Sequence, residues 1–156
     1  MIRNHVSRLS VAIDIAATPS QVWAVVEPIE DHVSWMHDAV AIRFQTEQNR
    51  GVGTAFLCDT KVGPFRLVDH MEITEWIRDS SMGVRHVGVV TGTGRFTLTS
   101  IDLGRRTRFR WDETLTFPWW LGGPIGALIG GRLVLRKIWG RNLRTLKQLV
   151  ESRLEP

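Results

Sequence analysis

The chain has 156 residues, a formal net charge of +4 and one cysteine, Cys58. This length predicts one domain, spanning residues 1–156, that buries roughly 70 % of its unfolded surface around one core. A lone cysteine excludes an internal disulfide, and no series of Cys and His has the spacing of a zinc site, so we expect no metal and no cofactor. The sequence has no signal peptide and no stretch of about 20 apolar residues, which predicts a cytoplasmic protein without stable membrane insertion.

The first 40 residues predict one strand and two short helices. Apolar residues alternate with small or polar ones from Leu9 to Ile15, the pattern of a half-buried strand. In Thr18-Pro19-Ser20-Gln21, Thr18 is suited to cap a helix, proline fits the first helical position and Gln21 completes a capping box. Pro28 ends this helix, and a second short helix or turn is expected over residues 31–36.

Residues 40–117 show an almost unbroken period of two, which predicts six antiparallel strands in a meander. Turn signals separate them at residues 49–51, 62–64, 78–80, 91–92 and 103–104. With the first strand, the predicted sheet has seven strands.

The last 30 or so residues predict a long amphipathic helix. Its apolar residues fall within one arc of about 140° on a helical wheel: Ile125, Leu128, Leu135, Ile138, Trp139, Leu143, Leu146, Leu149 and Val150. Seven Lys or Arg follow from Arg132 onward; without a nucleic-acid-binding motif they indicate a solvated helix face, and we expect no nucleic-acid partner. The sheet is the surface available to the apolar arc, so the layout is α+β.

Several segments carry a resemblance to a known family: Ile73-Thr74-Glu75-Trp76, Gly94 to Leu98, Arg106 to Trp111, and Leu143 to Glu151. Together with the order of elements, they resemble the START-like helix-grip superfamily, in particular its polyketide cyclase/dehydratase and lipid-transport (SRPBCC) branch. The resemblance implies a curved seven-stranded antiparallel sheet wrapped around the C-terminal helix. It also implies a deep apolar cavity, used in the family for lipids, sterols, polyketides, plant hormones and quinones. The chain has no Tyr, which excludes any mechanism that needs a phenol.

Glu113 interrupts an apolar strand face made by Phe109, Trp111, Leu115 and Phe117. Burial there costs several kcal/mol, so Glu113 should be neutral, partnered or facing a cavity. We expect a neutral carboxyl that donates a hydrogen bond to the ligand. The alternative is a strand-end glutamate that reaches solvent.

Histidines offer the other candidate chemistry. The predicted turns place His86 two strands and one row from Glu113, about 12 Å away, which excludes a direct pair. They place Asp69 opposite Val90, which makes an Asp69–His86 pair unexpected, and Gly88 beside Glu113 as open space. His86 either faces the ligand or is hydrogen-bonded within the wall. His32 and His37 lie five residues apart, too far round a helix to share a metal.

These features predict a protein that binds one small hydrophobic molecule, such as a lipid, polyketide or other polycyclic compound, between the sheet and the C-terminal helix. Alternatives are a polyketide aromatase/cyclase or dehydratase in which Glu113 or His86 moves a proton, and a quinone or lipid chaperone at a membrane surface. The uncharged segment 117–131 is either a lip of the cavity that contacts membrane transiently or a buried loop, and the protein is a monomer or homodimer. The predicted ligand-binding residues are Trp35, Phe56, Met71, His86, Phe96, Leu98, Trp111, Glu113, Leu128, Leu135 and Trp139.

Overall fold

The structure, a computed structural model, describes residues 5–118, 120 and 132–156. Its elements follow one another as β1 (His5–Ile15), α1 (Pro19–Val26), the 3-10 helix η1 (Ile29–Ser34), β2 (Ala39–Phe44), β3 (Ala55–Val62), β4 (Phe65–Ile77), β5 (Ser81–Val87), β6 (Thr91–Ile101), the 3-10 turn η2 (Asp102–Gly104), β7 (Arg106–Phe117) and α3 (Arg132–Ser152). The predicted strand, two short helices, six strands and long helix are confirmed. Residues 125 and 128 of the expected helix lie outside the described part.

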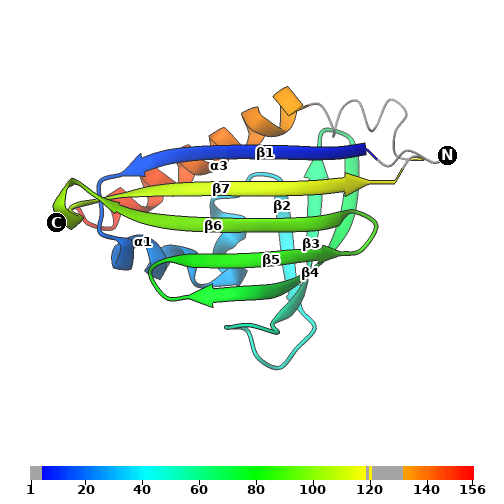
Figure 1. Cartoon of the computed structure of the whole chain (residues 1–156), viewed down its shortest axis with the longest axis horizontal. Helices are drawn as coiled ribbons and strands as arrows, with labels where there is room; N and C mark the ends of the chain where they lie inside the picture. The colour runs from blue at the N-terminus through cyan, green and yellow to red at the C-terminus, as the bar shows by residue number, and fades with distance from the viewer. Residues whose placement is uncertain (1–4, 119, 121–131) are drawn as a thin grey trace.

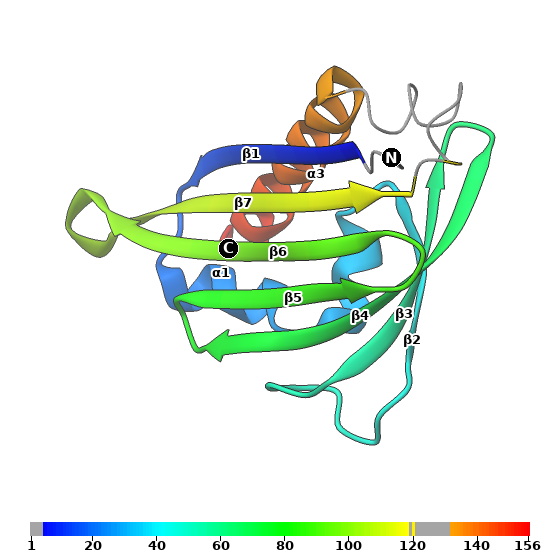
Figure 2. The ribbon, with the colours of Figure 1, turned by 45° about the vertical axis from the view of Figure 1, so that its right-hand side comes forward.

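The sheet is antiparallel throughout, in the order β1-β7-β6-β5-β4-β3-β2. It is therefore a meander in which β1 joins the far edge beside the last strand. Figure 1 shows α3 crossing one face of the sheet behind β1 and β7, with α1 on the same side. Figure 2 shows how β3 and β2 turn away from the direction of the central strands, so that the sheet curls around this side. The predicted α+β helix-grip fold is confirmed.

The capping box and the apolar faces predicted from the sequence are present in the structure. The capping box forms: the Gln21 amide donates to Thr18 Oγ1 at 3.3 Å, and the Thr18 amide donates to Gln21 Oε1 at 2.9 Å. The side chains that alternate inward on β7 and the apolar stripe of α3 meet in one core, where Phe109, Leu143 and Leu146 are fully buried or nearly so. None of the described helices has the length and apolarity needed to cross a membrane.

A buried polar contact fastens α3 to the segment before β2. Asn142, fully buried on α3, donates from Nδ2 to Asp38 Oδ1 at 2.7 Å and accepts from the His37 amide at 2.9 Å. An amide inside a core is stable only when its hydrogen bonds are made. These two bonds fix how far the helix stands from η1 and β2, and so fix one wall of the space beneath it.

Candidate functional site

A cavity of about 130 Å³ lies beneath the helix, between the curled sheet and α3. Its described walls are mostly apolar. They comprise, among others, Met36, Phe56, Met71, Ile73, Val84, Phe96, Trp111, Leu115, Leu135 and Trp139. The polar exceptions that face inward include Asp38, Asp69, His86 and Glu113.

Three of these polar residues form a continuous chain, and each comes from a different strand. Asp69 on β4 contacts His86 on β5, with 2.7 Å between Oδ2 and Nδ1. The other ring nitrogen of His86, Nε2, lies 3.1 Å from Glu113 Oε2 on β7. All three residues are buried, between 5 and 8 % exposed. The chain is anchored further by Trp111, whose indole N–H donates to Glu113 Oε1 at 3.0 Å.

Glycines on β6, the strand between His86 and Glu113, make the contact possible. Gly92 stands opposite His86, and Gly94 stands opposite Glu113. A Cβ at Gly94 would lie 2.4 Å from Glu113 Oε1, inside the space that the carboxylate occupies. The side chains of His86 and Glu113 can therefore contact each other across β6, because the β6 residues between them have no side chain. Their own strands, β5 and β7, are not neighbours in the sheet.

The predicted separation of His86 and Glu113 is wrong. The two residues do lie two strands and one row apart, but the predicted register put Phe96 and Leu98 between them, and bulky side chains there would keep them apart. The actual β5–β6 turn spans residues 88–90 rather than 91–92, which places Gly92 opposite His86. The β6–β7 register is also shifted from the predicted one, and it places Gly94 rather than Phe96 opposite Glu113. Gly88 follows β5 and would meet His70 with a Cβ at 3.1 Å, so it is not the open space beside Glu113.

The expectation against an Asp69–His86 pair is also wrong. A register shift between Ile73 and Glu75 moves the β4 partner of His86 to Met71. Asp69 then lies only one row beyond His86 on the same face of the sheet. A carboxylate and an imidazole on adjacent rows span that gap easily, which gives the 2.7 Å contact.

The two carboxylates keep His86 charged. Burial alone disfavours an imidazolium, but hydrogen bonds to Asp69 and Glu113, with their charges, outweigh burial and raise the pKa of His86 to about 10. A charged His86 donates from both nitrogens, so Glu113 accepts at both oxygens, from His86 and from Trp111. This geometry therefore does not provide the neutral Glu113 that we expected to donate a hydrogen bond. The cationic partner of Glu113 is His86, which lies in the neighbouring row of the sheet.

His32, on η1, is the second histidine of the cavity wall and behaves in the opposite way. Its Nε2 lies 2.7 Å from the carbonyl oxygen of Val26, and its ring packs against Trp35 and Phe96. Burial lowers the pKa of His32 to about 4, because no carboxylate contacts the ring to offset the loss of water. His32 is thus a neutral part of the wall.

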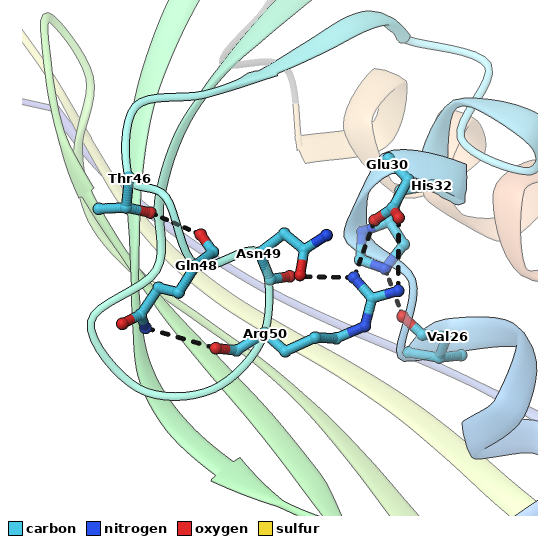
Figure 3. A network of polar contacts seen from close by, with 7 residues as sticks. All are labelled: Val26, Glu30, His32, Thr46, Gln48, Asn49 and Arg50. Atoms are coloured by element: carbon cyan, nitrogen blue, oxygen red, sulfur yellow. Dashed lines mark hydrogen bonds and ion pairs between the residues drawn. The ribbon is translucent and has the colours of Figure 1, made fainter.

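An ion pair at the surface fixes η1 to the loop between β2 and β3 (Figure 3). Arg50 reaches from this loop to Glu30 on η1, at 3.0 and 3.3 Å, and also donates to the Asn49 carbonyl. The Gln48 side chain donates to carbonyl oxygens of the same loop, including that of Arg50, and these hydrogen bonds stabilise the loop. The network holds η1, and with it His32, over one side of the cavity.

The structure places most of the predicted ligand-binding residues on the cavity wall, and it leaves some elsewhere. Eight line the cavity: Phe56, Met71, His86, Phe96, Trp111, Glu113, Leu135 and Trp139. Trp35 and Leu98 are buried in the core but are not among the described lining residues. Leu128, and residues 119 and 121–131 of the predicted lip, lie outside the described residues.

The polar residues of the wall that sequence reasoning missed include Asp38, Asp69 and His32. Asp69 carries a usable signal, because it interrupts an apolar strand face just as Glu113 does. His32 and His37 turn to different partners, Val26 and Thr145. Within the described part of the chain, no three residues among His, Cys, Asp and Glu form a group that could hold a metal ion.

Solved structures with the same fold are recognisable at low sequence identity. The chain is similar to the ZhuI aromatase/cyclase from Streptomyces sp. R1128, with 17 % identity, a TM-score of 0.72 and 97 % of both chains covered. Norcoclaurine synthase from Thalictrum flavum is similar at 11 % identity and a TM-score of 0.70, over 99 % of this chain and 100 % of that one. A START superfamily protein from Mycobacterium smegmatis is similar at 14 % identity and a TM-score of 0.67, over 94 and 95 %. These likenesses show the shared fold.

Comparison with curated proteins finds no match. The family model described as polyketide cyclase/dehydrase and lipid transport matches residues 7–151, which include every strand of the sheet in whole or in part and nearly all of α3. The chain therefore belongs to the polyketide cyclase/dehydrase and lipid transport family.

Proposed function

We propose that the chain binds one small hydrophobic molecule in the cavity, with the Asp69–His86–Glu113 chain facing the polar end of the ligand. The observation that carries this proposal is a buried ionic chain in a wall that is otherwise apolar. Burying three ionisable groups costs free energy that a filled apolar core would not require. Recognition of a polar group inside an apolar cavity gives such a chain a use.

The cavity volume sets the size of the ligand. About 130 Å³ is close to the roughly 150 Å³ of an engineered apolar cavity that binds benzene. It is well below the roughly 300–1,000 Å³ of sites that hold drug-sized ligands. This conformation therefore suits a molecule with a single ring, and a polyketide or a lipid chain would need the cavity to widen.

A matched pair of substitutions on β5 tests the binding site. Val84→Phe would fill the cavity, because Val84 faces it, whereas Val87→Phe adds the same bulk to a side chain that is 51 % exposed and not part of the described wall. Single-ring probes, followed by NMR of the tryptophan indole N–H signals, should bind the wild type and Val87→Phe. Binding to Val84→Phe should weaken at least about tenfold. Equal binding to both variants would place the ligand outside this cavity.

The second candidate function is a polyketide cyclase or dehydratase reaction in the same cavity. A histidine between two carboxylates favours it, because such a chain holds groups that can move or stabilise a proton at fixed positions. With both His86 nitrogens engaged, the spare acceptor capacity lies on the two carboxylates, Asp69 and Glu113, and Glu113 is the candidate that could take a proton from the ligand. The names of two similar structures, an aromatase/cyclase and a synthase, support an enzyme in general terms only.

Glu113→Gln separates binding from catalysis. Glutamine keeps the shape of the side chain and can still accept from Trp111, but it cannot take up a proton. Ligand binding should persist, while any cyclase or dehydratase turnover should fall by about 10² or more. Turnover that is unchanged in this variant would assign the chemistry to another group or leave binding as the function.

A further inference from the structure

The hydrogen bonds of the buried chain are unbalanced in favour of acceptors. An ionised carboxylate offers about four acceptor positions, so Asp69 and Glu113 together offer about eight. The described side chains supply three donors to them: the two N–H groups of His86 and the indole N–H of Trp111. Most acceptor positions at this wall therefore remain open.

One acceptor atom is unpartnered outright. Oδ1 of Asp69 is buried and has no hydrogen-bond partner among the described residues. The Asp69 side chain is only 10 % exposed, so bulk water does not serve it freely. A buried acceptor without a donor costs free energy, which a donor brought by a ligand would recover.

The net charge of the cavity wall is negative, which also favours a ligand that donates hydrogen bonds. Three described lining carboxylates, Asp38, Asp69 and Glu113, stand against one imidazolium, His86, which leaves a net charge of −2. Arg95 does not offset them, because its guanidinium is 54 % exposed and pairs with Glu75 at 2.9 Å. Residues 119 and 121–131 contain no charged side chain.

The remaining lining groups do not reverse this preference. Burial raises the pKa of the Cys58 thiol to about 11, so the thiol stays uncharged. Burial lowers the pKa of His32 to about 4, so that ring is neutral as well. The Asp38 carboxylate has a donor from Asn142 at 2.7 Å but no cation within ion-pair distance among the described residues. The indole N–H of Trp139, another lining residue, has no hydrogen-bond partner among the described residues, and it can donate to a second polar atom of the ligand.

From these observations we infer that the ligand of this cavity is neutral or cationic and presents a hydrogen-bond donor, a hydroxyl or a protonated amine, to Asp69 and Glu113. Carboxylates, fatty acids among them, are disfavoured because they bring charge of the same sign into a site of low dielectric. Groups that only accept, such as aldehyde or quinone carbonyls, leave the open acceptors unpaired. This inference rests on the proposed binding function and specifies its ligand class.

Four probes of nearly one shape test the inference on the intact chain: benzyl alcohol, benzylamine, benzaldehyde and benzoate. They carry, in that order, a neutral donor, a cationic donor, an acceptor alone and an anion, on one ring that suits a cavity of about 130 Å³. Dissociation constants come from NMR titration at pH 7 in the same buffer. At least one of the first two should bind about tenfold or more tightly than benzaldehyde and benzoate, and their order tells hydroxyl from amine.

Two other results of the titration would overturn either the ligand class or the binding function. If benzaldehyde or benzoate binds as tightly as the better of alcohol and amine, the ligand class is wrong, while the binding function stands. If no probe binds at all, the proposed function fails and the inference fails with it.

A substitution locates the effect on Asp69. Asp69→Asn removes one negative charge and adds an amide donor, so the preference for the best donor probe over benzaldehyde should fall to about threefold or less. Asp59→Asn is the matched control, because Asp59 is a half-exposed carboxylate on the neighbouring β3 that pairs with Arg43, away from the described cavity wall. An unchanged preference in Asp69→Asn, with the fold verified by near-ultraviolet circular dichroism, would overturn the role of Asp69. If that variant does not fold, Glu113→Gln serves the same comparison.

Discussion

His32 and His86 differ in charge although they are buried to the same degree. Each is 5 % exposed and lines the same cavity. His86 contacts two carboxylates, which raise its pKa to about 10 against the effect of burial. His32 contacts one carbonyl oxygen, and burial lowers its pKa to about 4. Depth of burial therefore does not decide the charge of a histidine; the partners at its two nitrogens do.

The two environments also differ in what they cost the fold. The His32 ring is part of an aromatic cluster with Trp35 and Phe96, a contact that stabilises the core without any charge. The His86 chain gathers opposite charges whose desolvation offsets much of their attraction. Removing one member of each environment should expose this difference.

The largest effect is expected from removal of His86. His86→Leu leaves Asp69 and Glu113 buried without their cation, which should lower the free energy of unfolding by about 3–5 kcal/mol. His32→Leu leaves a single carbonyl without its donor and should cost about 1–3 kcal/mol. Urea denaturation of both variants measures the difference. A smaller loss in His86→Leu than in His32→Leu would contradict a charged His86.

A triple variant sharpens the same point. Replacing Asp69, His86 and Glu113 together by leucine removes every charge of the chain, and apolar replacement of a buried ionic group is often neutral or stabilising. The triple variant should recover most of the free energy that His86→Leu loses, while donor-bearing probes lose their preference. Failure to recover would mean that the chain stabilises the fold in its own right.

The next effect concerns the glycine that lets the chain form. Gly94→Ala places a Cβ where Glu113 Oε1 now lies, at 2.4 Å, so the carboxylate must leave its contacts with His86 and Trp111. The expected cost is about 1–3 kcal/mol in urea denaturation, with a shifted Trp111 indole N–H signal. Gly140→Ala on α3 is the control: its Cβ would meet nothing nearer than 3.8 Å, and it should stabilise the helix by about 0.5–1 kcal/mol. Equal stability in the two variants would contradict the tight packing at Gly94.

Gly92 and Gly94 also show why the sequence predicts the fold better than the site. Alternating strands, the capping box at Thr18 and the apolar stripe of α3 are local patterns, and within the described residues they form as predicted. Thr91-Gly92-Thr93-Gly94 looks like a turn by composition but lies inside β6, where a Cβ on Gly92 would meet the Thr114 carbonyl oxygen at 1.9 Å. Glycine there serves a close approach between strands rather than a reversal of the chain.

Register is the quantity that local patterns fix poorly. The inward positions of Asp69, His86 and Glu113 follow from alternation alone, so each residue is predicted on the correct face. Their contacts depend on the turn at residues 88–90, on the β6–β7 register and on the irregularity between Ile73 and Glu75, and each of these changes which side chains meet. A strand face interrupted by a single ionisable residue was the usable signal, and three such interruptions on one sheet indicate a shared site.

The pH dependence of stability should separate the two histidines. The folded pKa of His86, about 10, is above its ordinary 6.5, so its contribution is complete below about pH 6.5 and is lost as pH rises towards 10. The folded pKa of His32, about 4, is below its ordinary value, so stability falls as pH drops from about 6.5 towards 4. Each slope is at most about 1.4 kcal/mol per pH unit. Urea midpoints across pH 4.5–9.5 measure both slopes. His86→Leu should flatten the slope above pH 6.5 that comes from His86, and His32→Gln should flatten the slope between pH 6.5 and 4.5 that comes from His32.

The smallest effect is expected at the ion pair that holds η1. Arg50 and Glu30 are 37 and 41 % exposed, so Arg50→Ala should cost at most about 1 kcal/mol. The variant also tests what keeps His32 neutral, because burial is the largest cause of the lowered pKa of His32 and the Arg50 charge is a smaller one. The stability slope between pH 6.5 and 4.5 should therefore stay as in the wild type, with a slightly lower midpoint at every pH. Loss of that slope in Arg50→Ala, with unchanged near-ultraviolet circular dichroism, would contradict this expectation. It would mean that a surface charge, rather than burial, sets the protonation state of His32. Neighbouring charges would then explain the difference between His32 and His86 at both sites.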